Sequence, residues 1–255
     1  MKNFYFTATG NSLAIAKEFG GELYSIPKVL KSNQIHFEDE KIGLIFPCYG
    51  FAAPSIVQEF IAKVTLKSPY IFVIMTYGNT LADSVRWFVR FAGQHNITIH
   101  YGEGLLMVDN CLPLFDMEQQ KLKEKHTEEN LSRLLADVNQ GKEYIRRGTF
   151  VDSLMTQAVH GLLKLNPNFY SDRDFLIGDQ CNGCGTCTKV CPRDNITIDT
   201  KQGGIKPVYG GHCEFCLACI NLCSRQAIRL KKEKNPNARF RNENVTLKEI
   251  ISAND

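Results

Sequence analysis

Eight of the ten cysteines in this chain of 255 residues fall into two runs that share one spacing. The runs are Cys181-x2-Cys184-x2-Cys187-x3-Cys191-Pro192 and Cys213-x2-Cys216-x2-Cys219-x3-Cys223. In such a run, three cysteines separated by two residues each wrap around one cube of iron and sulfide, while the fourth cysteine ligates the other cube. The spacing therefore predicts two 4Fe-4S clusters in a chain that carries electrons.

The fourth cysteine of each run makes the predicted ligand assignment a crossed one. Cluster one is expected to take Cys181, Cys184, Cys187 and Cys223, and cluster two Cys213, Cys216, Cys219 and Cys191. Structural zinc sites are the alternative, but they need only four ligands per ion, usually from two separated CxxC pairs, so the third cysteine of each run would be superfluous. A Rieske centre would need two histidines on one iron, and His212 beside Cys213 has no such companion.

The composition is that of an ordinary soluble protein, with 44% hydrophobic and 22% charged residues in a length that suits two modest domains. We expect no membrane span, because no long apolar run occurs, and the opening MKNFYFTATG favours a strand over a secretion signal. Only Cys48 and Cys111 lie outside the runs, so we expect no disulfide framework and a reducing, cytoplasmic compartment. Exposed low-potential clusters would further suit a cell that avoids oxygen.

The formal charge of +3, from 30 basic and 27 acidic residues, counts the cluster ligands as neutral thiols. Two oxidised clusters, each carrying about −2 with its four thiolates, would bring the net charge to about −1. A basic segment follows the second run and contains Arg225, Arg229, Lys231, Lys232, Lys234, Arg239 and Arg241 against the single Glu233. This segment is either a solvated tail or a docking surface for an acidic partner, and its lack of aromatic platforms argues against nucleic acid.

The first 145 residues alternate short apolar runs with amphipathic stretches. Strands are predicted at Phe4–Thr7, Leu23–Ile26, Ile42–Phe46, Tyr70–Thr76 and about Ile97–Tyr101. Helices are predicted at Ser12–Phe19, Pro54–Val64, Leu81–Phe91 and Met117–Val138. This alternation indicates an α/β domain with a doubly wound, five-stranded parallel sheet, in which ligands bind beyond the carboxyl ends of the strands.

Three loops at those strand ends form the second candidate site. The first loop contains Thr7, Thr9, Gly10, Asn11 and Ser12 and leads directly into a helix, so its hydroxyls and backbone N–H groups suit an anion. It lacks the glycines of a dinucleotide fingerprint and the Lys of a Walker loop, which favours a terminal phosphate monoester. The other two loops offer glycines, backbone donors and aromatic rings for a flat ring system: Pro47, Tyr49, Gly50, Phe51, Thr76, Tyr77, Gly78 and Asn79.

These motifs support a resemblance at the level of families. Residues 1 to about 140 resemble the flavodoxin-like fold, whose first loop reads Thr/Ser-x-Thr-Gly-Asn-Thr/Ser and binds the phosphate of FMN. Residues 176 to about 230 resemble a bacterial two-cluster ferredoxin, and the whole chain is similar to flavodoxin-ferredoxin fusion proteins of anaerobic bacteria and archaea. The resemblance implies FMN beside the two clusters. Trp87 lies within a predicted helix, so Tyr49 or Tyr77 would have to stack on the flavin.

An amphipathic helical linker is predicted within residues 146–175, between a flavodoxin-like domain at 1–145 and a ferredoxin domain at 176–255 that ends in the basic tail. Thr149 is the expected cap and Pro167 the expected stop. Its apolar residues recur at helical spacing: Val151, Leu154, Met155, Ala158, Val159, Leu162, Leu163 and Leu165. We expect this stripe to be buried by packing between the domains, because its polar face lacks the Lys and Arg of a membrane-surface helix.

The function expected from the sequence is electron transfer between the clusters, FMN and redox partner proteins. The alternative is an FMN-dependent reductase of a small acceptor, for which no His, Lys or carboxylate group stands out as acid-base machinery, and no catalytic residue is predicted. A third interpretation makes the first domain a flavodoxin scaffold without flavin, used for docking. Donor, acceptor, direction of electron flow and oligomeric state are open.

Overall fold

The structure, a computed structural model, describes residues 1–166, 171–199 and 205–254. The chain divides into two compact units. The first comprises Met1–Thr7, Ser12–Met107 and the described part of Lys125–Pro167, and the second comprises Ala8–Asn11, Val108–Glu124 and the described part of Asn168–Asp255. Two short segments, Ala8–Asn11 and Val108–Glu124, thus belong to the second unit. The predicted division into consecutive domains places both of them in the first domain, at 1–145.

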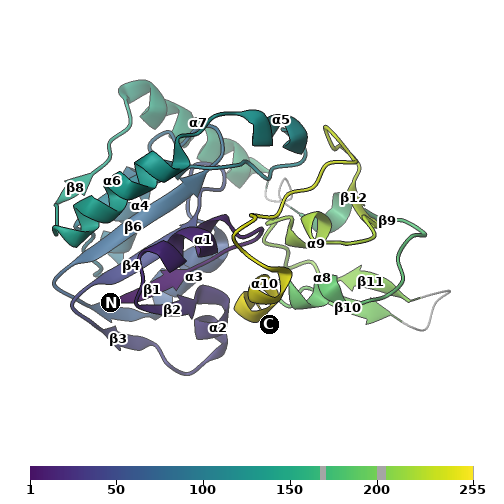
Figure 1. The fold of residues 1–255 in the computed structure, drawn as a ribbon, viewed down its shortest axis with the longest axis horizontal. Helices are drawn as coiled ribbons and strands as arrows, with labels where there is room; N and C mark the ends of the chain where they lie inside the picture. Colours follow the sequence, from purple (N-terminus) through teal and green to yellow (C-terminus); the bar gives the residue numbers. More distant parts are fainter. Residues whose placement is uncertain (167–170, 200–204, 255) are drawn as a thin grey trace. The chain divides into compact units, whose positions relative to one another are not determined.

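A six-stranded parallel sheet forms the first unit, in the order β2-β1-β4-β6-β7-β8 (Figure 1). Its strands are β1 Lys2–Tyr5, β2 Glu22–Ser25, β4 Ile42–Pro47, β6 Ile71–Tyr77, β7 Tyr101–Leu106 and β8 Tyr144–Ile145. The first five follow the order 2-1-3-4-5 of doubly wound sheets, so the predicted parallel α/β architecture is confirmed. A separate parallel pair joins β3 His36–Glu38 to β5 Thr65–Lys67.

The fifth strand lies later in the chain than predicted. It begins at Tyr101 instead of Ile97, and its sequence YGEGLL has two glycines that lower its β propensity. A Cβ atom at Gly102 would lie 2.8 Å from Val85, and one at Gly104 would collide with Leu81. These glycines therefore mark a close approach to the start of helix α4, Ser84–Gln94, which is a long-range constraint that a local pattern does not reveal.

Helices cover both faces of the sheet in the first unit. They are α1 Asn11–Glu18, α2 Ile26–Lys31, α3 Ser55–Lys63, α4 Ser84–Gln94, α6 Thr127–Asn139 and α7 Phe150–Leu165. Tyr101 donates a hydrogen bond to Asp137 of α6, while the glycines of the same strand face α4, so these two helices lie on opposite faces. Pro167, the expected stop of α7, lies outside the described residues, and α7 ends at Leu165 with Asn166 as its cap.

The helix predicted over Met117–Val138 is two helices. These are α5 Met117–Leu122, in the second unit, and α6. His126 adopts a left-handed conformation at φ 47 and precedes the first residue of α6, which breaks the run. Helix α2 was not predicted, because it follows β2 directly and is only six residues long.

The second unit repeats one pattern after 32 residues. Helix α8 Thr186–Lys189 corresponds to α9 Ala218–Asn221, and β10 Ile196–Asp199 corresponds to β12 Ile228–Leu230. β10 pairs antiparallel with β11 Lys206–Tyr209, and β12 with β9 Phe175–Ile177. A 3-10 turn at Asp172–Asp174 and helix α10 Leu247–Asn254 complete the unit. In the described part of the chain, no helix is long and apolar enough to cross a membrane.

Left-handed backbone positions also recur with this repeat. Gly183 and Gly185 have φ values of 68 and 74 in the first copy, and the matching residues Phe215 and Leu217 have values of 51 and 60. Glycine adopts this conformation without strain, whereas a bulky side chain does so at a cost. The second copy therefore keeps the same loop shape with large apolar side chains in place of glycines.

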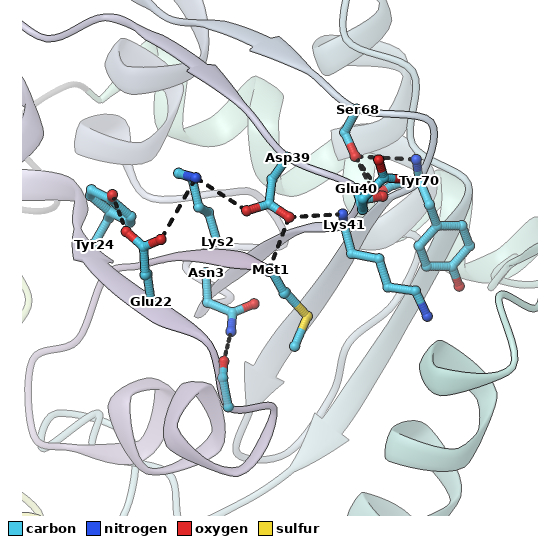
Figure 2. Close-up of polar contacts among 11 residues, drawn as sticks. Met1, Lys2, Asn3, Glu22, Tyr24, Asp39, Glu40, Lys41, Ser68 and Tyr70 are labelled. Carbon is cyan, nitrogen blue, oxygen red and sulfur yellow. Dashed lines mark hydrogen bonds and ion pairs between the residues drawn. The ribbon is translucent and has the colours of Figure 1, made fainter.

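Polar contacts fasten the amino end of the first unit's sheet (Figure 2). The carboxylate of Asp39 lies 3.0 Å from the N-terminal ammonium and 3.1 Å from Lys2 Nζ. The hydrogen bond from the N-terminal ammonium is the main cause that lowers the pKa of Asp39 from 3.8 to about 2, and Lys2 adds to this shift. Asp39 thus ties the start of the first strand to the segment between β3 and β4.

We expect Asp39→Asn to lower the free energy of unfolding by about 1 kcal/mol, because the variant loses a carboxylate that pairs with two cations. The folded-state pKa lies below the ordinary value of 3.8, so this stabilisation is present above that pH and is lost as pH falls toward about 2. The deficit in thermal midpoint of the anaerobic protein, followed by circular dichroism, should therefore be constant between about pH 5 and pH 7. The exposed neighbour Glu40→Gln is the matched control, and an equal deficit there would contradict a specific role for Asp39.

Candidate iron-sulfur site

Four cysteines from both runs line one pocket in the second unit. They are Cys181, Cys184 and Cys187 of the first run and Cys223 of the second. Apolar side chains complete the wall, namely Ile198, Pro207, Ala227 and Ile228. The fourth cysteine of the second run therefore lies with the three closely spaced cysteines of the first, as the crossed assignment requires.

The loop that carries the first three cysteines depends on glycine. Gly183 and Gly185 have left-handed φ values, and a Cβ atom at Gly183 would collide with Ile205. This conformation curls the chain around the pocket before α8 begins at Thr186. The glycines thus explain why three thiols separated by two residues can converge.

The remaining four cysteines form the second group. Cys216 and Cys219 are buried, and burial raises the pKa of both thiols well above the ordinary range. Burial likewise raises the pKa of Cys213 to about 12. A negative charge on Cys191 raises all three of these pKa values further, which indicates that Cys191 lies beside this group.

The first group lies nearer to solvent. Cys184 is exposed, and a hydrogen bond with the Thr186 hydroxyl, 3.4 Å from its Sγ, lowers the pKa of Cys184. Burial raises the pKa of Cys187 to about 11, and Cys181 and Cys184 add to the shift. The Cys187 thiol, like those of Cys213, Cys216 and Cys219, is thus protonated at neutral pH in the metal-free chain, and binding of iron must displace those protons.

Hydrogen-bond donors surround the sulfur atoms. The backbone N–H of Asn195 donates to Cys191 Sγ at 3.4 Å, and that of Ala227 donates to Cys223 Sγ at 3.3 Å, each four residues after its cysteine. The N–H of Phe215 donates to Cys213 Sγ at 3.3 Å. The Tyr209 hydroxyl, on β11, donates to Cys219 Sγ at 3.8 Å. Such bonds stabilise negative charge on the sulfurs and raise the reduction potential of a bound cluster.

Asn195 is a supporting residue that the sequence did not reveal. Its side chain accepts a hydrogen bond from the backbone N–H of His212 at 2.6 Å and donates one to Asp172 at 2.7 Å. Together with its bond to Cys191, these contacts fix the end of the first run against the start of the second. His212 itself is exposed.

The basic segment is folded into the second unit. Glu233 is buried and pairs with Arg239 at 2.9 Å and with Arg229 at 3.7 Å. Lys231 pairs with Asp174 at 3.0 Å, and Arg241 donates to the carbonyl of Val245 at 2.9 Å. A fully solvated tail is therefore wrong, because four of its seven cations hold the segment in place.

The hydroxyl residues of the loop predicted for the FMN phosphate are buried. Thr7, Thr9 and Ser12 are buried, with 2%, 2% and 1% of their surfaces exposed. Thr9 Oγ1 accepts a hydrogen bond from the Asn110 side chain at 3.0 Å, and the Ser12 and Thr76 hydroxyls lie 2.9 Å apart. These hydroxyls are thus already bonded to groups of the chain itself.

Asn242 closes the same loop in the second unit. Its backbone N–H donates to the carbonyl of Thr9 at 2.8 Å, and its side chain donates to Asn11 Oδ1 at 3.0 Å. A Cβ atom at Gly10 would lie 2.9 Å from that of Asn242 and 3.1 Å from that of Val245. The loop therefore packs against residues more than 200 positions later in the chain.

The two loops predicted for the flavin ring are compact. Tyr49 and Ala52 exchange backbone hydrogen bonds of 2.9 and 3.0 Å around Gly50 and Phe51, whose left-handed φ values of 56 and 63 define a tight hairpin turn. Pro47 ends β4, Thr76 and Tyr77 end β6, and Gly78 and Asn79 follow, with Asn79 exposed. The structure thus brings Thr76 to Ser12, while the flavin contacts of these loops stay a prediction.

The two cysteines outside the runs have local contacts. Cys48 Sγ lies 3.2 Å from the Ser84 hydroxyl at the start of α4. Burial raises the pKa of Cys111 to about 12, so this thiol is protonated at neutral pH. Neither carries a functional assignment.

Among the described residues, no three of His, Cys, Asp or Glu converge closely enough to hold a single metal ion. A cube spreads its four thiolates over four irons, so its cysteines need not meet at one point as the ligands of a zinc ion do.

Comparison with known proteins decides the class of this site. Residues 173–224 match the family described as the 4Fe-4S dicluster domain. The second unit therefore contains an iron-sulfur cluster-binding domain of the ferredoxin kind, and this supports a role in electron transfer. No curated protein matches the chain.

One solved structure is similar to the first part of the chain. It is described as the Trp repressor binding protein from Bacillus subtilis, with 9% sequence identity and a TM-score of 0.31, over 55% of this chain and 97% of that one.

We expect Tyr209→Phe to lower one cluster midpoint potential by about 20–60 mV, which corresponds to one lost hydrogen bond of about 0.5–1.5 kcal/mol in a one-electron couple. The measurement is an anaerobic redox titration followed by low-temperature EPR. Tyr144→Phe, at an exposed tyrosine of the first unit, is the matched control and should change no potential. An unchanged potential in Tyr209→Phe would contradict the hydrogen bond to Cys219.

Proposed function

We propose that the chain is an electron carrier that holds two 4Fe-4S clusters with crossed ligands. Cys181, Cys184, Cys187 and Cys223 would hold one cluster, and Cys213, Cys216, Cys219 and Cys191 the other. The observation that supports this most is the shared pocket of Cys223 with the three cysteines of the first run. Bound clusters of this kind store and release single electrons.

The two groups of cysteines differ in their exposure to solvent. Cys216 and Cys219 are buried, and Phe215 and Leu217 stand where the first copy has glycines, so the second group is shielded from water. Cys184 of the first group is exposed. Because electron transfer weakens steeply with distance, an external partner is expected to exchange electrons at the first group.

Arg225 favours an acidic partner at that place. It is exposed, it lines the pocket of the first group, and its charge acts on Cys184. Opposite charge on a partner speeds encounter and orients it toward the exposed cysteine. We therefore include in the proposal a redox protein with an acidic docking face.

FMN does not fit the loop predicted for its phosphate as that loop lies here. The side chains of Thr9 and Asn11 accept hydrogen bonds from Asn110 and Asn242, and Gly10 packs against Val245, so a segment of the chain itself already occupies this loop. The proposed function accordingly needs no flavin. In this proposal the α/β unit is a flavodoxin scaffold without flavin that is used for docking, the third of the functions considered from the sequence.

The crossed assignment makes a specific prediction for cysteine variants. Cys187→Ala should lower the iron and sulfide content of anaerobically reconstituted protein by about half, because one of two cages is broken. Cys223→Ala should leave the same residual EPR signal as Cys187→Ala, and Cys191→Ala the same signal as Cys219→Ala. If Cys223→Ala instead matches Cys219→Ala, the ligands are not crossed.

Cys48→Ala serves as the control, since this cysteine lies outside both runs, and it should keep full iron and sulfide. Should a variant fail to fold, the exposed position allows a milder replacement, Cys184→Ser, with the same expected loss. Unchanged iron in both variants of the first group would refute the proposed ligands.

The absence of flavin from the proposal is tested separately. We expect acid extraction of the anaerobically purified protein, followed by chromatography, to release far less than one FMN per chain. A flavodoxin produced in the same host is the positive control. One FMN per chain would show that the segment around Asn242 leaves the loop, and it would return flavin to the function.

A further inference from the structure

Helix α7 carries an apolar stripe that faces away from the rest of its unit. Val151, Leu154, Leu162 and Leu165 are 70%, 51%, 65% and 85% exposed. The small residues Ala158 and Gly161 lie between them on the same side of the helix, at spacings of three and four residues. The expected burial of the stripe is wrong for these four side chains.

The opposite side of α7 is fastened to the first unit. Thr156 is buried and accepts a hydrogen bond from the backbone N–H of Asp83 at 3.3 Å. The Ser153 hydroxyl donates to the Asp83 carboxylate at 2.9 Å, and the His160 ring lies 5.4 Å from that of Trp87 on α4. A capping box of Thr149 and Asp152 fixes the first turn. The helix is therefore held with its apolar stripe outward.

The stripe is laid out symmetrically about Ala158. Leu154 and Leu162 lie four residues before and after it, and Val151 and Leu165 lie seven residues before and after it. An identical helix running antiparallel, with a two-fold axis at Ala158, would place Leu154 beside Leu162 of the second copy and Val151 beside its Leu165. The small side chain at the centre allows the two helices to approach closely.

The size and charge of the stripe favour a second copy as the occupant. The four exposed side chains together with Phe150, which is 78% exposed, offer on the order of 600 Å² per chain, so a symmetric pair would bury about 1,200 Å², the lower end for stable interfaces. Asp152 and Lys164 are the only Asp, Glu, Lys or Arg residues of α7, and neither belongs to the stripe. An anionic membrane would require flanking cations, whereas self-pairing requires none.

We propose that α7 is the interface of a homodimer in which two copies of the helix pack antiparallel across a two-fold axis at Ala158. The interface is independent of the cluster sites, which belong to the other unit. Each dimer would then present two iron-sulfur units on one pair of scaffolds.

Light scattering coupled to size-exclusion chromatography of the anaerobic full chain tests the proposal. The wild type is expected at twice the chain mass of 28.8 kDa, and Leu154→Lys and Leu162→Glu, each alone, at 28.8 kDa. An equimolar mixture of these two variants should recover the dimer mass, because the antiparallel arrangement brings the new Lys beside the new Glu of the other chain. Leu122→Lys, at an 86% exposed leucine of α5, is the control and should leave the dimer intact.

Cluster absorbance and circular dichroism of each variant verify that the chain is folded and loaded. A monomeric wild type would overturn the proposal, whether the stripe then proves to bind vesicles or to be covered within the chain. A dimer that persists in Leu154→Lys would overturn the assignment to α7. An equimolar mixture of Leu154→Lys and Leu162→Glu that stays at 28.8 kDa, with both variants folded and loaded, would overturn the antiparallel arrangement.

Discussion

The burial of negative charge on sulfur is the constraint on which the second unit depends. Cys213, Cys216 and Cys219 sit where burial raises the pKa of each thiol, and Cys191 lies beside them. Thiolates in such a place are tolerated only if cations replace the protons, which is what iron supplies. With β strands of only three or four residues, the unit gains from the metal the stability that a small core does not provide.

The proposed crossed ligands would give the internal repeat a structural reason. In that assignment each copy supplies three cysteines to its own group and one to the other, so neither copy would complete a site alone. The backbone donors repeat in the same way. The N–H groups of Asn195 and Ala227, at equivalent positions of the two copies, donate to Cys191 and Cys223. The copies then diverge in their loops, with Gly183 and Gly185 at the more exposed group and Phe215 and Leu217 at the buried one. The two copies thus share one loop shape, while their different side chains would give the two proposed clusters different exposure to solvent.

Local signals in the sequence were sufficient for much of this. Cysteine spacing predicted that Cys223 lies with the three cysteines of the first run, and alternating apolar runs predicted a parallel α/β sheet. The fifth strand, which the apolar pattern places too early in the chain, shows the limit of local signals. Val85 and Leu81 leave no room for a Cβ atom at Gly102 and Gly104, and those glycines weaken the strand pattern in the sequence. Asn195 likewise acts through tertiary contacts with His212 and Asp172. Such residues have no periodicity or spacing to reveal them.

The loop at Thr7–Ser12 shows how a motif of the phosphate-binding kind can take its hydrogen-bond partners from within the chain. Its sequence encodes a turn whose hydroxyls and backbone groups converge, and those groups recognise oxygen and N–H partners of any origin. Asn110 and Asn242 provide such partners from within the chain, without the charge of a phosphate. An intramolecular amide also pays little of the translational entropy that a dissociable ligand loses on binding. The same loop chemistry can therefore anchor distant segments of the chain, and the two uses differ only in the partners that the rest of the chain supplies.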